Sequence, residues 1–138
     1  MRIAINGFGR IGRNILRAIH EGRRNELAVV ALNDLASAAT NAHLLRHDSV
    51  HGAFPGTVGV GDGAIDIGHG PIAVCAERDP AKLPWARLGV DLVLECTGLF
   101  TKRKLGAATL DELEDLLIES DLGVDTAECA AQYVVSAY

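Results

Sequence analysis

Three glycines near the amino terminus have the spacing of a phosphate-binding turn. Gly7, Gly9 and Gly12 form a G-x-G-x-x-G pattern. In such a pattern the first glycine permits a tight turn, the second lets the backbone approach a pyrophosphate, and the third allows a helix to pack closely on a strand. The pyrophosphate would bind free backbone N–H groups at the positive end of the helix dipole. Glycine-rich turns are common, so the pattern indicates dinucleotide binding only together with its surroundings.

Asp34 is a second residue with the right type and position. It follows Gly12 by 22 residues, where a dinucleotide fold places the acid that binds the adenosine ribose hydroxyls. The alternative is a solvent-facing turn acid or a helix cap. With the glycine pattern, Asp34 makes dinucleotide binding the leading hypothesis. It also predicts NAD rather than its 2′-phosphorylated form, because a carboxylate repels a phosphate.

A strand, a helix and a second strand must position these residues. Residues 2–6 are a short β-branched run that ends at Gly7, and apolar residues then recur at helical spacing to residue 21. Residues 27–32 are apolar throughout, as in a parallel strand covered on both faces. These elements predict one right-handed βαβ unit.

Further elements extend this unit into an α/β domain. One or two helical turns are expected over residues 41–47, and an antiparallel hairpin around Gly61-Asp62-Gly63. Residues 71–75 and 90–96 read as two more strands. We therefore expect an α/β fold, a doubly wound, mostly parallel Rossmann-type sheet that is partial, with the strand order 3-2-1-4 and a helical C-terminal tail.

Five segments share the sequence pattern of one family. They are Ile5–Arg13, Asn33-Asp34, Ala42–Gly52, Glu77–Pro80 with Leu83–Trp85, and Leu94–Thr101. In this order, over about residues 1–103, they resemble the NAD-binding domain of the glyceraldehyde-3-phosphate dehydrogenase family of glycolytic oxidoreductases.

The resemblance implies NAD as the cofactor and a role for individual residues. The segment that contains the glycine pattern would surround the pyrophosphate and its ribose, Asp34 would hold the adenosine ribose, and Arg78 would lie along the adenine side. Residues near the end of the matching region would line the adenine pocket and the path toward nicotinamide. The implied cofactor-binding residues are Asn6, Gly7, Phe8, Gly9, Arg10, Ile11, Gly12, Asp34, Arg78, Thr97, Gly98 and Phe100.

No catalytic residue is expected in this chain. The family's nucleophilic cysteine lies in a Ser-x-Cys-Thr-Thr-Asn-type segment, and Cys75, Cys96 and Cys129 do not occur in one. We interpret them as reduced packing or surface thiols. Without a base-paired thiolate there is no route to a thiohemiacetal, so the chain is not expected to turn over alone. His43, His47 and His51 are spaced four residues apart, but the helix is not expected to pass residue 49, and we predict no metal site.

The charge changes abruptly near residue 104. Residues 1–104 hold 13 basic and 10 acidic residues, whereas residues 105–138 hold 8 acidic residues and no basic one. We therefore expect two parts, a dinucleotide-binding half-domain over 1–104 and an acidic helical tail over 105–138 that packs on it or is swapped across it. Helices are predicted over 110–118 and 127–138, although residues 133–137 also fit a strand.

The tail has a resemblance of its own. Residues 110–127 resemble the helical N-domain of the signal-recognition-particle receptor GTPases. This would make the chain a chimera or a truncated fusion, and the alternative is a divergent natural tail. No G-x-x-x-x-G-K-[ST] pattern occurs, so GTP hydrolysis is not implied.

Composition narrows the location and the partners. No stretch approaches the roughly 18 apolar residues of a membrane span, and no signal peptide precedes Gly7, so we expect a cytoplasmic protein without a membrane partner. Aromatic residues make up only 4% of the chain, which argues against nucleic-acid stacking. The arginines of residues 10–24 are interpreted as a solvated face. Exposed sheet edges predict a homodimer, by edge pairing or tail exchange.

Several functions remain open on the sequence alone. The leading one is an NAD-binding module without turnover. The alternatives are a fragment of an active aldehyde-oxidising dehydrogenase that a partner completes, an engineered or accidental fusion in which ligand binding is incidental, and RNA binding by the arginine face.

Overall fold

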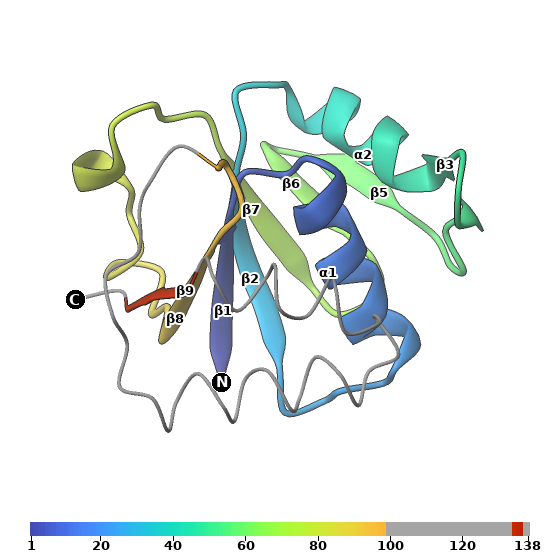
Figure 1. Cartoon of the computed structure of the whole chain (residues 1–138), viewed down its shortest axis with the longest axis horizontal. Coiled ribbons are helices and arrows are strands. Elements are labelled where there is room, and N and C mark those ends of the chain that lie inside the picture. The colour runs from blue at the N-terminus through green and yellow to red at the C-terminus, as the bar shows by residue number, and fades with distance from the viewer. Residues whose placement is uncertain (99–133, 137–138) are drawn as a thin grey trace.

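The computed structural model describes residues 1–98 and 134–136, and a single large sheet forms its centre (Figure 1). Among the described residues the sheet has seven strands in the order β5-β6-β7-β2-β1-β8-β9. The inner strands β7 (Pro71–Cys75), β2 (Ala28–Asn33), β1 (Arg2–Asn6) and β8 (Leu92–Glu95) run parallel. Numbered in chain order, these four strands have the expected 3-2-1-4 arrangement. Because they are parallel, their carboxyl ends lie at one edge of the sheet.

Helix α1 (Arg10–Glu21) joins β1 to β2 and covers one face of the sheet (Figure 1). Its buried side chains include Ile15, Leu16 and Ile19, which form the apolar stripe that the sequence spacing predicted. The predicted βαβ unit is therefore present.

Side chains alternate between two apolar clusters across the sheet. In β1, Ile3 and Ile5 belong to the cluster on the α1 side, whereas Ala4 belongs to a second cluster on the opposite face. Trp85 closes the second cluster from the connection between β7 and β8, which includes the 3₁₀ helix η1 (Pro80–Lys82). Burial on both faces explains why the parallel strands have continuous apolar sequences.

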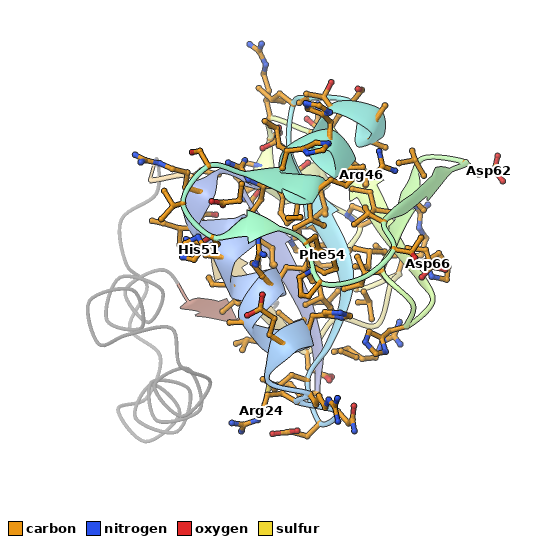
Figure 2. The ribbon with its side chains drawn as sticks, turned by 90° about the vertical axis from the view of Figure 1, so that its right-hand side faces the viewer. Arg24, Arg46, His51, Phe54, Asp62 and Asp66 are labelled. Carbon is orange, nitrogen blue, oxygen red and sulfur yellow. The ribbon has the colours of Figure 1, made fainter. Side chains whose placement is uncertain are left out.

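An antiparallel hairpin extends the sheet beyond β7. Strands β5 (Gly59–Gly61) and β6 (Ala64–Asp66) pair across a two-residue turn, as predicted. Both turn residues have positive φ, 49° at Asp62 and 69° at Gly63, as in the type I′ turns that suit hairpins. Asp62 lies at the tip of the hairpin, whereas Phe54 points into the interior (Figure 2).

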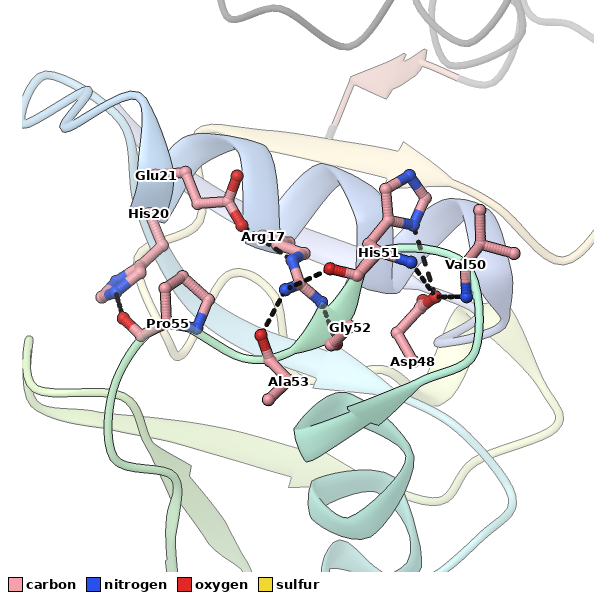
Figure 3. A network of polar contacts seen from close by, with 9 residues as sticks. All are labelled: Arg17, His20, Glu21, Asp48, Val50, His51, Gly52, Ala53 and Pro55. Carbon is pink, nitrogen blue, oxygen red and sulfur yellow. Dashed lines mark hydrogen bonds and ion pairs between the residues drawn. The ribbon is translucent and has the colours of Figure 1, made fainter.

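Arg17 attaches a second region to α1. This region follows helix α2 (Ala38–Arg46) and contains the short pair β3 (His47–Asp48) and β4 (Gly52–Ala53). The Arg17 guanidinium donates to the carbonyls of residues 51, 52 and 53 and pairs with Glu21 (Figure 3). Arg17 is 7% exposed, so the expectation of a solvated arginine face is wrong at this residue. The side chain is drawn inward by the carbonyls of His51 and of β4, which helical periodicity does not reveal.

The last described segment is a strand. β9 (Val134–Ser136) pairs antiparallel with β8, and Val135 lies opposite Val93. The favoured helix is therefore wrong for these three residues, because the open edge of β8 supplies hydrogen bonds that a short β-branched segment takes up. The predicted helix over 110–118 lies outside the described residues.

Candidate dinucleotide-binding site

A pocket of about 690 Å³ opens at the carboxyl ends of the four parallel strands. Open α/β sheets bind ligands at this edge. Its lining comes from the segments that follow β1, β2, β7 and β8, and consists of Asn6, Gly7, Gly9, Asn33, Asp34, Leu35, Glu77, Arg78, Pro80, Leu83, Cys96 and Thr97.

The glycine pattern forms the turn between β1 and α1. Gly7 has a φ of +94°, and a Cβ there would lie 2.7 Å from the backbone nitrogen of Thr97. A Cβ on Gly12 would collide with the carbonyl oxygen of Gly7. The geometry therefore requires glycine at the tight turn and at the helix–strand contact, the two roles assigned from the sequence.

Gly9 differs from the other two glycines. It caps α1 with ordinary backbone angles, φ −75° and ψ −160°, and no atom lies within 4 Å of a Cβ placed on it. Gly9 has no side chain to cap α1, and the first N–H groups of a helix have no partner within the helix. A free helix N-terminus of this kind favours an anion.

Asp34 holds the glycine turn and also faces the pocket. Its Oδ2 accepts a hydrogen bond of 3.0 Å from the N–H of Phe8, and its Oδ1 accepts one of 2.9 Å from the N–H of Ala36. The alternative of a turn acid thus describes part of its role. Each carboxylate oxygen has two lone pairs, so Asp34 retains acceptor capacity toward the pocket.

A chain of buried amides crosses the strand ends. Asn33 and the backbone of Glu77 exchange two hydrogen bonds, and Asn33 Nδ2 donates to Asn6 Oδ1 at 2.8 Å. Asn6 Nδ2 donates to Glu95 Oε2 at 2.6 Å, and Glu95 Oε1 accepts from the N–H and hydroxyl of Thr97. Adjacent strand ends are thereby tied together behind the pocket.

The structure brings together half of the residues expected from the sequence. Those that line the pocket are Asn6, Gly7, Gly9, Asp34, Arg78 and Thr97. Arg10 is exposed on the first turn of α1, Ile11 packs on the core, Gly12 is buried, and Gly98 is exposed with a φ of +71°. Phe100 lies outside the described residues.

Phe8 has a different place from the one expected. Its side chain is fully buried in the core, its N–H donates to Asp34, and its carbonyl accepts from Arg13. Phe8 therefore shapes the turn from inside and does not line the pocket. Burial of the apolar Phe8 ring in the core is favourable, and the side chain therefore points away from the pocket.

Several lining residues were not assigned by sequence reasoning. They are Asn33, Leu35, Glu77, Pro80, Leu83 and Cys96. Their common signal is position, because each lies at the carboxyl end of a parallel strand or in the loop that follows it, and the same signal had identified Asp34.

The described thiols are poor candidates for a nucleophile. Burial raises the pKa of the Cys75 thiol, and the nearby charge of Arg87 opposes this only in part. A raised pKa keeps the thiol protonated at neutral pH, and the thiolate is the reactive form. Cys96 packs on the core beside the pocket, and Cys129 lies outside the described residues.

The described residues contain neither a metal-binding cluster nor a membrane-spanning helix. No group of three His, Cys, Asp or Glu side chains is placed to hold a metal ion in this part of the chain. Within the same residues, no helix has the length and apolar character needed to cross a membrane.

Comparison with known proteins gives consistent matches for the amino-terminal part. The family described as "Glyceraldehyde 3-phosphate dehydrogenase, NAD binding domain" matches residues 1–103. The glyceraldehyde-3-phosphate dehydrogenase of Cereibacter sphaeroides is 62% identical over 110 residues, which cover 80% of this chain and 32% of that protein. The corresponding enzyme of Xanthobacter flavus is 61% identical over 110 residues, with 80% and 33% covered, and that of Pseudomonas aeruginosa is 60% identical over 111 residues, again with 80% and 33% covered.

The chain thus spans about a third of the length of the curated relatives it matches. These matches lend no support to the resemblance of residues 110–127 to signal-recognition-particle receptor GTPases, or to a chimera.

Proposed function

The chain belongs to the glyceraldehyde-3-phosphate dehydrogenase family through its NAD-binding domain, and from this premise we propose that it binds NAD in the pocket at the strand ends. The observation that carries the proposal is the convergence of four separate segments on one pocket. They bring the glycine turn, Asp34, Arg78 and Thr97 together.

The residues present fit the parts of a dinucleotide. The pyrophosphate is assigned to the uncapped start of α1, where the open space at Gly9 admits it and N–H groups of the first turn face it. The adenosine ribose is assigned to the remaining lone pairs of Asp34, and the adenine side to Arg78. Thr97, Gly98 and Phe100 are assigned to the path toward nicotinamide.

Bound NAD would supply hydride-transfer chemistry, whereas the described residues supply binding and orientation. The 138 residues contain no Ser-x-Cys-Thr-Thr-Asn segment. We therefore propose a cofactor-binding module that, as this chain alone, does not oxidise glyceraldehyde 3-phosphate. Wild-type protein should show no phosphate-dependent oxidation of glyceraldehyde 3-phosphate, and any such activity above that of a Cys96→Ser control would contradict the proposal.

The alternative is a part of an active dehydrogenase that a second polypeptide completes. The relatives are glyceraldehyde-3-phosphate dehydrogenases, but this chain matches only about a third of their length, so they do not favour this alternative over a binding module. Adding a separately expressed catalytic domain and following the absorbance of reduced cofactor separates this alternative from a module that only binds.

The organisation beyond residue 104 is also a proposal. We assign residues 105–138 to a second part that covers the open edge of β8, and the pairing of β9 with β8 supports this. A homodimer by edge pairing or tail exchange, and a cytoplasmic location, follow from the sequence arguments alone.

Calorimetric titration with NAD tests the proposed function. Wild-type protein should bind NAD. If two hydrogen bonds to the nicotinamide half are missing, its affinity should be roughly 30-fold lower than that of a site with both hydrogen bonds. Gly9→Val should remain folded and lose binding, because its side chain would fill the space assigned to the pyrophosphate. Equal NAD binding by a folded Gly9→Val variant would place the ligand elsewhere, and a wild-type protein that does not bind millimolar NAD would refute the proposal.

A further inference from the structure

Glu95 is a buried acid that none of the roles above uses. It ends β8 and is only 5% exposed. Its carboxylate accepts hydrogen bonds from Asn6 Nδ2 at 2.6 Å, from the N–H of Thr97 at 2.9 Å, and from the Thr97 hydroxyl. A buried acid so placed connects the end of β1 to the turn after β8.

The backbone of Glu77, at the end of the amide chain away from Glu95, determines which atoms of the chain donate and which accept. The Glu77 N–H donates to Asn33 Oδ1 at 2.9 Å, and Asn33 Nδ2 donates to the Glu77 carbonyl at 2.8 Å. A backbone N–H only donates and a carbonyl only accepts, so the Asn33 amide has one possible orientation. Asn33 Nδ2 then donates to Asn6 Oδ1, which leaves Asn6 Nδ2 to donate in turn. The chain therefore requires an acceptor at residue 95.

The turn after β8 also lies directly against the glycine turn. A Cβ on Gly7 would lie within 3 Å of two Thr97 atoms, the backbone nitrogen and Cγ2. A shift of Thr97 would therefore displace the turn that precedes α1. Asn6, Gly7, Asn33, Glu77 and Thr97 all line the pocket, so the chain determines the relative positions of its walls.

We propose that Glu95 is a positioning residue, a carboxylate that fixes the Thr97 turn and the glycine turn in the arrangement that receives the cofactor. The assignment of the cofactor rests on the proposed function, whereas the positioning of the two turns does not. Glu95 acts through Asn6 and Thr97 and does not itself line the pocket.

A glutamine cannot replace Glu95 in this chain. Its amide has one acceptor oxygen and one donor nitrogen, so the nitrogen would face either Asn6 Nδ2 or the N–H of Thr97, both of which donate.

A second substitution, Asn6→Asp, removes this mismatch between two donors. The carboxylate introduced at position 6 accepts from Asn33 Nδ2 and from the amide nitrogen introduced at position 95, and the oxygen of that same amide accepts from Thr97. The double variant Asn6→Asp/Glu95→Gln keeps every contact of the chain and the net charge of wild type, with the direction of the hydrogen bond between positions 6 and 95 reversed.

The test compares wild type, Glu95→Gln, Asn6→Asp and the double variant. Amide hydrogen exchange at Thr97, measured by NMR without ligand, reports on the position of the turn, and calorimetry reports the Kd for NAD. We expect Glu95→Gln to speed exchange at Thr97 and to weaken NAD binding, each about tenfold. The double variant should recover most of the protection at Thr97, whereas its NAD affinity also reflects the carboxylate introduced at position 6, which lines the pocket.

Glu77→Gln is the matched control. It removes one negative charge at the same pocket, but only the Glu77 backbone belongs to the chain, so exchange at Thr97 should stay as in wild type. Equal acceleration by Glu77→Gln would assign the effect to charge and overturn the proposal.

The remaining outcomes are also decisive. The proposal fails if Glu95→Gln behaves as wild type, or if amide exchange at Thr97 in the double variant is as fast as in the worse single variant. If Glu95→Gln does not fold, the proposal requires that the double variant folds with wild-type exchange at Thr97, and an unfolded double variant overturns it. If wild type does not bind NAD, the proposed function fails, while the exchange measurements still decide the role of Glu95.

Discussion

Asp34 combines a structural contact with a proposed ligand contact. Its carboxylate holds the N–H of Phe8 and so helps to fix the glycine turn, and it lines the pocket where the adenosine ribose is assigned. A loss of NAD affinity on substitution would therefore mix two effects. The ratio of affinities for two cofactors separates them, because a distorted turn weakens both cofactors alike.

We predict that wild type prefers NAD to NADP, and that Asp34→Asn reduces this preference. The carboxylate accepts hydrogen bonds from a free 2′-hydroxyl and repels a 2′-phosphate. A charged hydrogen bond contributes about 1.5–3 kcal/mol, which corresponds to roughly 10- to 150-fold in affinity. Paired calorimetric titrations with NAD and NADP measure the ratio. Equal affinities in wild type, or an unchanged ratio in Asp34→Asn, would reject the assignment.

The three glycines should differ when each is replaced by alanine. Gly12→Ala forces a Cβ against the Gly7 carbonyl and should lower the free energy of unfolding by about 1–3 kcal/mol. Gly9→Ala meets no atom beyond its own segment within 4 Å, but Gly9 is the N-cap of α1, where alanine is less favourable than glycine, so the change should lower the free energy of unfolding by less than about 1 kcal/mol. Urea denaturation measures both. Equal destabilisation by the two changes would show that the turn is built differently.

At the scale of elements, the sequence predicted the parts that periodicity controls. The βαβ unit, the Asp62-Gly63 hairpin and the order of the parallel strands were predicted, because apolar spacing and turn residues specify them locally. The strand Val134–Ser136 was not, since its structure depends on the free edge of β8, which is a tertiary contact. The buried Arg17 was missed for the same reason, because its partners are carbonyls of a loop that begins 34 residues later.

The loop held by Arg17 should show a pH-dependent stability that originates at Asp48. The N–H groups of His51 and Val50 donate to its carboxylate and lower the pKa of Asp48 in the folded state (Figure 3). A lowered folded pKa means that this contribution is complete above the ordinary Asp pKa of about 4. It is lost as the pH falls through the folded value.

We therefore predict that Asp48→Ala lowers the melting temperature at pH 7, and that its difference from wild type narrows below about pH 4. Thermal unfolding followed by circular dichroism at pH 7 and pH 3 measures this. Ser49→Ala, at an exposed neighbour without a titrating group, should differ from wild type equally at both pH values. A constant difference for Asp48→Ala would contradict the account.

At the scale of the whole molecule, the sequence predicted part of the lining of the candidate pocket but not its full composition. The glycine turn was predictable because its backbone geometry demands glycine, and Asp34 was predictable because of its distance in the sequence from that turn. Asn33, Glu77 and Cys96 were not, because any of several residues could stand there, and only the relative placement of strand ends brings them to the pocket. The role of Glu95 depends on three segments at once and has no local signal.

Truncation after Lys104 tests the second part of the chain. It removes β9 and leaves the edge of β8 open, so we predict aggregation or loss of cooperative melting. Size-exclusion chromatography and thermal unfolding measure the outcome. A monomeric, cooperatively folded product would mean that residues 105–138 contribute nothing to the fold.

The most direct test of the central claim is to map NAD binding by NMR on the isotopically labelled chain. Amide signals of residues 7–12, Asp34, Arg78 and Thr97 should shift on titration with NAD, whereas those of the β5–β6 hairpin should stay in place. Shifts confined to the hairpin or to the arginines of α1, or no shift at millimolar NAD, would contradict the assignment of this pocket to the cofactor.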